Sequence, residues 1–214
     1  MPDLAALAAA ARGLLPSAIA IATADPAQPA APPWPGEALP NAVPKRQREF
    51  AAGRHAARAA LAQLGLPAQA IPQGPDRAPI WPPGVNGSIT HSDTLCLAAV
   101  TQGQTLIGID LEPATPLERD LWDAILLPQE RETLTDHPNA PLFAKLIFSA
   151  KEAAYKAQYT RSKTLIGFEA FHITLSATGF TARFTQNVSG FAAGTHLDGR
   201  YTQTQGHYLT TVAH

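Results

Sequence analysis

Helical patterns followed by strand patterns occur in this order in both halves of the chain, and this order constrains the fold more than any other feature of the sequence. Apolar residues recur at helical spacing, as Phe50, Ala57 and Leu61 do, whereas the strand segments are rich in β-branched and aromatic residues separated by glycine-containing turns. Runs of helices followed by runs of strands are typical of an α+β fold. The expected helices cover 3–15, 44–64, 117–126, 129–135 and 142–159, and the expected strands cover 18–23, 87–90, 95–100, 106–112, 168–176, 179–186, 191–197 and 208–212.

We therefore expect two α+β subdomains, an N-terminal one over residues 1–112 and a C-terminal one over residues 113–214. A chain of 214 residues suffices for one large domain or two small ones. Its 45% hydrophobic and 15% charged residues are typical of a folded globular protein.

The bulk properties also bear on partners and location. The formal net charge of -1 gives no reason to expect nucleic acid as a partner, and no apolar run approaches the roughly 20 residues that span a bilayer. The single cysteine, Cys96, is expected to be a buried thiol, which fits a cytoplasmic protein. Residues 25–44 contain seven prolines and are expected to form an extended segment that is functional or mobile.

The acidic residues Asp110 and Glu112 end the strand LIGIDLE, residues 106–112. Because alternate side chains of a strand point to the same face, these two carboxylates are neighbours and repel each other. They fit either a solvated strand end or a site for a cation. Glu152, in a later helix, could add a third carboxylate to an oxygen site for Mg²⁺, or could simply pair with Lys156 on the helix surface.

Basic residues form a stripe on the helix expected over 44–64. Arg46, Arg54 and Arg58 fall within about 80–120° around the helix axis. Arginine side chains in this arrangement suit the oxygens of a phosphate group, although a solvated basic face is the simpler interpretation. A third group of interest is the segment GSITHSD, residues 87–93, in which Gly87 would let a ligand approach the backbone and Ser88 and His91 add polar groups.

Taken in order, the segments RQREFAAGRHAARAAL, PIWPPGVNGSITHS, IGIDLEP and FSAKEAAYKA resemble the 4′-phosphopantetheinyl transferases. More narrowly, they resemble the siderophore-synthesis (enterobactin synthase component) branch of the larger, single-chain class. The resemblance runs from about Lys45 to Ile173, and its most specific part is the pair GIDxE and FSxKExxYK. It implies two similar α+β halves with pseudo-twofold symmetry and coenzyme A bound at their junction. It also implies transfer of the phosphopantetheine arm of coenzyme A to a serine of an apo carrier protein, with release of 3′,5′-ADP.

The resemblance assigns catalytic and metal-binding roles to four residues. Asp110, Glu112 and Glu152 match the family's acidic site for Mg²⁺, with Mn²⁺ as an alternative. Lys156 matches a lysine that stabilises the pyrophosphate or the leaving group, and Glu152 is also a candidate base for the carrier serine. Ala153 stands where family members often have serine, a small change that is not expected to remove activity.

The resemblance further implies contacts with coenzyme A, the co-substrate. The side chains that match coenzyme A-contacting positions are Arg46, Arg54, Arg58, Arg77, Ser88, His91, Lys151 and Lys156. The partner would be a peptidyl, aryl or acyl carrier protein, and we expect a monomer without a membrane span. Two other functions stay open: a non-catalytic protein that binds coenzyme A or a carrier protein, and a different Mg²⁺-dependent enzyme that acts on another nucleotide.

Overall fold

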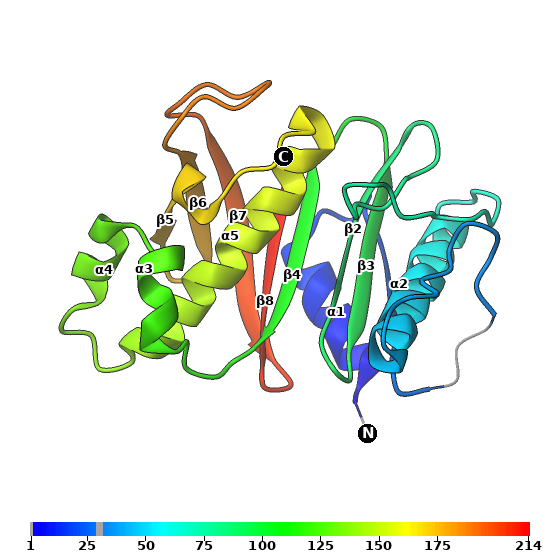
Figure 1. Ribbon diagram of the computed structural model, residues 1–214, viewed down its shortest axis with the longest axis horizontal. Helices are drawn as coiled ribbons and strands as arrows, with labels where there is room; N and C mark the ends of the chain where they lie inside the picture. Colours follow the sequence, from blue (N-terminus) through cyan, green and yellow to red (C-terminus); the bar gives the residue numbers. More distant parts are fainter. Residues whose placement is uncertain (1, 29–31) are drawn as a thin grey trace. The chain divides into compact units, whose positions relative to one another are not determined.

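The chain folds into two compact units, residues 1–107 and 108–214, in a computed structural model that describes residues 2–28 and 32–214 (Figure 1). Both units combine helices with a sheet, which is antiparallel in the first unit and from β5 to β8 in the second, and this confirms the expected α+β class. Residues 29–31 of the proline-rich segment lie outside the described residues.

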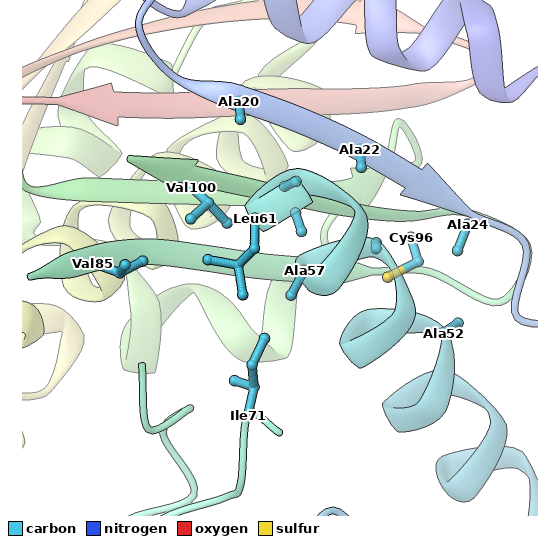
Figure 2. Close-up of a cluster of buried hydrophobic side chains, with 13 residues drawn as sticks. Ala20, Ala22, Ala24, Ala52, Ala57, Leu61, Ile71, Val85, Cys96 and Val100 are labelled. Atoms are coloured by element: carbon cyan, nitrogen blue, oxygen red, sulfur yellow. The ribbon is translucent and has the colours of Figure 1, made fainter. Parts of the chain in front are cut away.

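The first unit packs the long helix α2 against a sheet with the strand order β1-β3-β2, in which both strand pairs are antiparallel. Figure 2 shows the core between them, which is built mostly from alanine with a few larger side chains such as Leu61 and Val100. Small side chains let the helix approach the sheet closely, and Cys96 is fully buried there, as expected. The elements of this unit are α1 (Leu4–Leu14), β1 (Ala20–Ala24), α2 (Pro44–Gln63), β2 (Val85–His91) and β3 (Cys96–Gln102).

The second unit packs the long helix α5 across a sheet with the strand order β4-β8-β7-β6-β5 (Figure 1). The strand β4, which carries the acidic residues, belongs to this unit because it is the sheet neighbour of β8. The boundary between the units falls between Ile107 and Gly108, just inside β4, whereas the boundary expected from the sequence lies after residue 112. The elements are β4 (Ile107–Pro113), η1 (Arg119–Leu121), α3 (Trp122–Ile125), α4 (Pro128–Leu134), α5 (Ala140–Ser162), η2 (Phe168–Ala170), β5 (Phe171–Leu175), β6 (Gly179–Phe184), β7 (His196–Thr204) and β8 (His207–Ala213).

Close packing between β4 and α5 depends on small residues on both elements. A Cβ atom at Gly108 would overlap the carbonyl oxygen of Ala153 and would lie 2.7 Å from the amide nitrogen of Ala157. Both alanines are fully buried. The glycine of the motif thus allows the acidic strand to lie against the helix that carries Glu152, and position 153 accommodates only a small side chain.

Two expected elements differ from the structure. In place of the helix expected over 117–126, the chain forms a 3₁₀ turn followed by the four-residue helix α3. The prediction of a strand over 191–197 is wrong, because β7 begins at His196. The segment before β7 turns at Gly190 and Gly194, which both have positive φ. No helix among the described residues is both long enough and apolar enough to cross a membrane.

Candidate active-site residues

Four polar side chains of α5 share one face of the helix. Lys145, Ser149, Glu152 and Lys156 are spaced by four, three and four residues, which places them within about 60° around the helix axis. Lys145, Ser149 and Lys156 contact the carboxylates of β4, and these carboxylates help to raise the pKa of Glu152, so this face lies against the acidic end of the strand.

Asp110 is buried and fully compensated by neighbouring groups. One carboxylate oxygen lies 2.6 Å from the ammonium nitrogen of Lys156, and the other accepts a hydrogen bond from the Ser149 hydroxyl at 2.9 Å. The Ser149 hydroxyl is also hydrogen-bonded to Thr210 of β8 at 2.9 Å. Lys156 additionally donates to the carbonyl of Ile109 at 3.1 Å. These contacts fix both the charge and the direction of the Asp110 side chain.

The negative charges of Glu112 and Glu152 are less completely balanced by neighbouring positive charges and hydrogen bonds than the charge of Asp110. Glu112 lies 3.3 Å from Lys145, and burial followed by the charge of Asp110 raises its pKa. Burial is also the main cause that raises the pKa of Glu152. The positive charge of Lys156 lowers this pKa, and the negative charges of Asp110 and Glu112 raise it further. Among the described residues, Glu152 has no hydrogen-bond partner. The negative charges of the three carboxylates therefore repel one another.

This set of side chains fits a hard divalent cation in charge and in donor type, since carboxylate oxygens are the ligands that Mg²⁺ takes in proteins. Within residues 2–28 and 32–214, however, no three His, Cys, Asp or Glu side chains are arranged so that they could already hold a metal ion. Lys156 and Lys145 contact the carboxylates instead. A cation there would compete with two ammonium groups for the same oxygens.

Lys151, which is predicted to contact a phosphate, does not belong to this group of side chains. Its side chain is completely buried, and its ammonium group lies 2.8 Å from Glu130, 2.8 Å from the carbonyl of Ile125 and 3.0 Å from the carbonyl of Phe168. These three acceptors use all three of its N–H donors. The physical reason is helical geometry, because residue 151 lies about 100° around the helix from residue 152.

In the first unit, Arg46 and His91 lie together although 45 residues separate them. A terminal nitrogen of Arg46 is 2.5 Å from Nε2 of His91, and it is 3.4 Å from Glu49. Glu49 is also 3.7 Å from Nδ1 of His91. The start of α2 and the end of β2 thus present a partly exposed arginine and histidine side by side.

Arg54 is buried and Arg58 is half-buried, so neither lies on a fully solvated stripe. Arg54 donates from Nε to the carbonyl of Ile71 at 2.7 Å, and its guanidinium lies 4.0 Å from the centre of the Phe50 ring. Burial lowers its pKa to about 10, so the group keeps its positive charge at neutral pH. Arg58 is paired with Glu37 at 2.6 Å, which makes it a poor candidate for a contact with coenzyme A.

The remaining residues of the coenzyme A assignment lie on different parts of the first unit. Ser88 is buried on β2, whereas Arg77 is exposed in a turn with φ of 66° and makes no side-chain hydrogen bond or ion pair with the described residues. Gly87 leaves room for the Trp81 ring, which would be 2.7 Å from a Cβ atom at that position. The absence of a side chain at residue 87 is therefore explained by packing of Trp81 rather than by a ligand.

Several residues that shape these groups were not identified from the sequence. Lys145 and Ser149 could have been found by continuing the spacing of Glu152 and Lys156 toward the start of α5. No local pattern marks Glu37, Glu130 or Thr210, because their partners lie far along the chain.

Two family models together match most of the chain. The 4′-phosphopantetheinyl transferase N-terminal domain matches residues 34–101, and the 4′-phosphopantetheinyl transferase superfamily matches residues 106–213. The chain is 40% identical to the 4′-phosphopantetheinyl transferase Npt of Nocardia iowensis, over 82% of this chain and 86% of Npt. It is 38% identical to PptT of Mycobacterium tuberculosis, over 84% of this chain and 85% of PptT. It is 41% identical to enterobactin synthase component D of Escherichia coli K12, over 63% of this chain and 65% of that protein.

Proposed function

This chain belongs to the 4′-phosphopantetheinyl transferase superfamily, and we propose that it transfers the phosphopantetheine arm of coenzyme A to a serine of an apo carrier protein. The observation that carries this proposal is the group formed by Asp110, Glu112, Glu152 and Lys156 on β4 and α5. A protein that only binds coenzyme A has no need for three adjacent carboxylates beside a lysine, whereas transfer of a phosphoryl group does.

In the proposed reaction, the serine oxygen of the carrier attacks the phosphorus next to pantetheine. The new P–O bond forms as the bond to the second phosphate breaks, so that 3′,5′-ADP leaves with the bonding electron pair. The serine proton passes to a base, for which Glu152 is the candidate because burial raises its pKa and no hydrogen bond to a described residue engages it. Lys156 compensates the negative charge that grows on the leaving group.

A bound Mg²⁺ ion would supply positive charge to the pyrophosphate, and Asp110, Glu112 and Glu152 are the residues that would hold it. Mn²⁺ accepts the same ligands. Since Glu152 cannot be both a tight metal ligand and a free base, we assign it to the metal first and to proton transfer, directly or through water, second.

For coenzyme A we propose that Arg54 and Arg46 bind the 3′-phosphate, with His91, Ser88 and Arg77 near neighbouring groups. Nε is the only nitrogen of Arg54 that hydrogen-bonds to a described residue, so its two terminal nitrogens are available for a phosphate. We also propose a cytoplasmic monomer, which light scattering would test for the oligomeric state.

Intact-protein mass spectrometry tests the proposed function. The protein, coenzyme A and Mg²⁺ are mixed with a panel of apo carrier domains, and with each carrier in which the acceptor serine is replaced by alanine. We expect one carrier to gain a single phosphopantetheine mass, an equal amount of 3′,5′-ADP to appear, and the serine variant to stay unmodified. Binding of coenzyme A without a mass gain on any carrier would favour a non-catalytic binding protein instead.

A further inference from the structure

Glu37 is a buried carboxylate in the proline-rich segment, with an exposed fraction of only 2%. Both of its carboxylate oxygens lie 2.6 Å from a terminal nitrogen of Arg58. One oxygen also accepts the backbone N–H of Ile71 at 2.8 Å, and the other accepts the backbone N–H of Trp34 at 3.2 Å. A carboxylate is expensive to bury, so four contacts of this quality indicate a defined role.

The contact with Ile71 connects Glu37 to Arg54. Ile71 is fully buried, and while its N–H donates to Glu37, its carbonyl accepts the hydrogen bond from Nε of Arg54 at 2.7 Å. The Phe50 ring, 4.0 Å from the guanidinium carbon, limits the movement of Arg54 on another side. Fixing the backbone of Ile71 therefore fixes the direction in which Arg54 points its two terminal nitrogens.

The negative charge of Glu37 also balances part of the positive charge of the neighbouring arginines. Arg46 and Arg58 each act to lower the pKa of Arg54, and the Glu37 carboxylate acts to raise it. Without Glu37, the half-buried Arg58 would lose its ion-pair partner, and Arg54 would face two like charges with less compensation.

We propose that Glu37 is a positioning residue for coenzyme A binding, which holds Arg54, through Ile71, in the orientation that receives the 3′-phosphate. This inference rests on the proposed function, since it takes Arg54 as the phosphate contact. The opposing explanation is that Glu37 only fastens the proline-rich segment to α2. The two explanations differ in one measurable property, the preference of the protein for a ligand with a 3′-phosphate.

The experiment compares binding of coenzyme A and of 3′-dephospho-coenzyme A, which differ only in that phosphate, by isothermal titration calorimetry. We expect Glu37→Gln to weaken coenzyme A binding by roughly tenfold, the size of one hydrogen bond to a charged group, and to leave binding of 3′-dephospho-coenzyme A unchanged. Glu37→Asp, which keeps the charge, should retain part of the preference and serves as the test variant if Glu37→Gln does not fold.

Glu130→Gln is a matched control in the second unit. Glu130 is equally buried, pairs with one cation, Lys151, and accepts two backbone N–H groups, from Leu127 and Ile173. The substitution should lower the stability in the same way but leave the preference for the 3′-phosphate as in the wild type.

A double-mutant cycle with Arg54→Ala separates the inference from the proposed function. If Glu37 acts through Arg54, Glu37→Gln has no further effect on the preference in the Arg54→Ala background. If Arg54→Ala removes the preference while Glu37→Gln and Glu37→Asp both keep it, the positioning role is wrong and the proposed function stands. If Arg54→Ala keeps the preference, the phosphate assignment of Arg54 fails and the inference fails with it.

Discussion

The ammonium nitrogen of Lys156 lies 2.6 Å from a carboxylate oxygen of Asp110, which lies 46 residues earlier in the chain. Lys156 also donates to the carbonyl of Ile109, so it is anchored to β4 at two points. This lysine brings a positive charge into direct contact with the buried Asp110. The same ammonium group is the one proposed to stabilise the leaving 3′,5′-ADP.

Replacement of Lys156 by methionine should therefore have two opposite effects. We expect kcat for phosphopantetheine transfer to fall by about 100-fold, because a charge that stabilises the leaving group is lost. We expect Mn²⁺ binding, measured by calorimetry, to become tighter, because the cation no longer competes with an ammonium group for Asp110. Lys163→Met, at the exposed end of α5, is the control and should change neither quantity. Weaker Mn²⁺ binding in Lys156→Met would contradict the competition.

Glu152 should make the stability of the metal-free protein depend on pH. Burial raises its pKa in the folded state, so folding favours the protonated form. Its stabilising contribution is present at low pH and is lost as the pH rises through the raised pKa. In urea unfolding with EDTA, Glu152→Gln should become more stable relative to wild type as the pH rises from 4 to 8. The exposed Glu132→Gln should track the wild type, and a Glu152→Gln protein that is less stable than wild type at pH 8 would refute this account.

The buried pair of Lys151 and Glu130 should matter for stability and not for substrate binding. Lys151→Met leaves Glu130 without its cation, so we expect a loss of about 3–5 kcal/mol in the free energy of unfolding. The double variant Lys151→Met/Glu130→Leu should lose less, because no unpaired charge stays buried. For the folded fraction, KM for coenzyme A should match the wild type. A clear rise in KM for Lys151→Met with unchanged stability would instead support a phosphate contact.

Gly108 should not tolerate a side chain. Gly108→Ala pushes a methyl group into the backbone of α5 at Ala153, and we expect a loss of about 3 kcal/mol in the free energy of unfolding, together with reduced transfer. Gly13→Ala is the control, because a methyl group there meets no atom within 4 Å and helix α1 should gain about 0.5–1 kcal/mol. Equal stability of Gly108→Ala and the wild type would show that β4 and α5 can separate without cost.

Local patterns were sufficient for much of the fold. The helix α2 begins at Pro44 and ends just before Gly65, as proline at the start and glycine after the end of a helix predict. The sequence pattern placed the strand β7 wrongly. Its residues are mostly polar and include Gly199, and both features weaken the pattern that predicts a strand. Only the structure shows why glycine is there, since the Phe180 ring of the neighbouring strand covers it.

Sequence spacing alone predicts those parts of the candidate site in which the side chains share one face of a strand or a helix. The carboxylates of β4 and the polar face of α5 follow from periods of 2 and 3.6 residues. Lys151 and Arg58 were taken as ligand contacts because they are charged residues in a matching motif, whereas the structure pairs each of them with a buried glutamate. Their partners, Glu130 and Glu37, lie on elements whose position only the tertiary fold determines.

The most direct test of the central claim is the mass of an apo carrier protein after incubation with coenzyme A and Mg²⁺, with the wild type and Glu152→Gln compared at equal concentration. Glu132→Gln serves as a control for the loss of one negative charge. The proposed function predicts that the wild type and Glu132→Gln add one phosphopantetheine group to the carrier, and that Glu152→Gln adds it at least about 100-fold more slowly. Equal rates for Glu152→Gln and the wild type would contradict the assignment of the active site to β4 and α5.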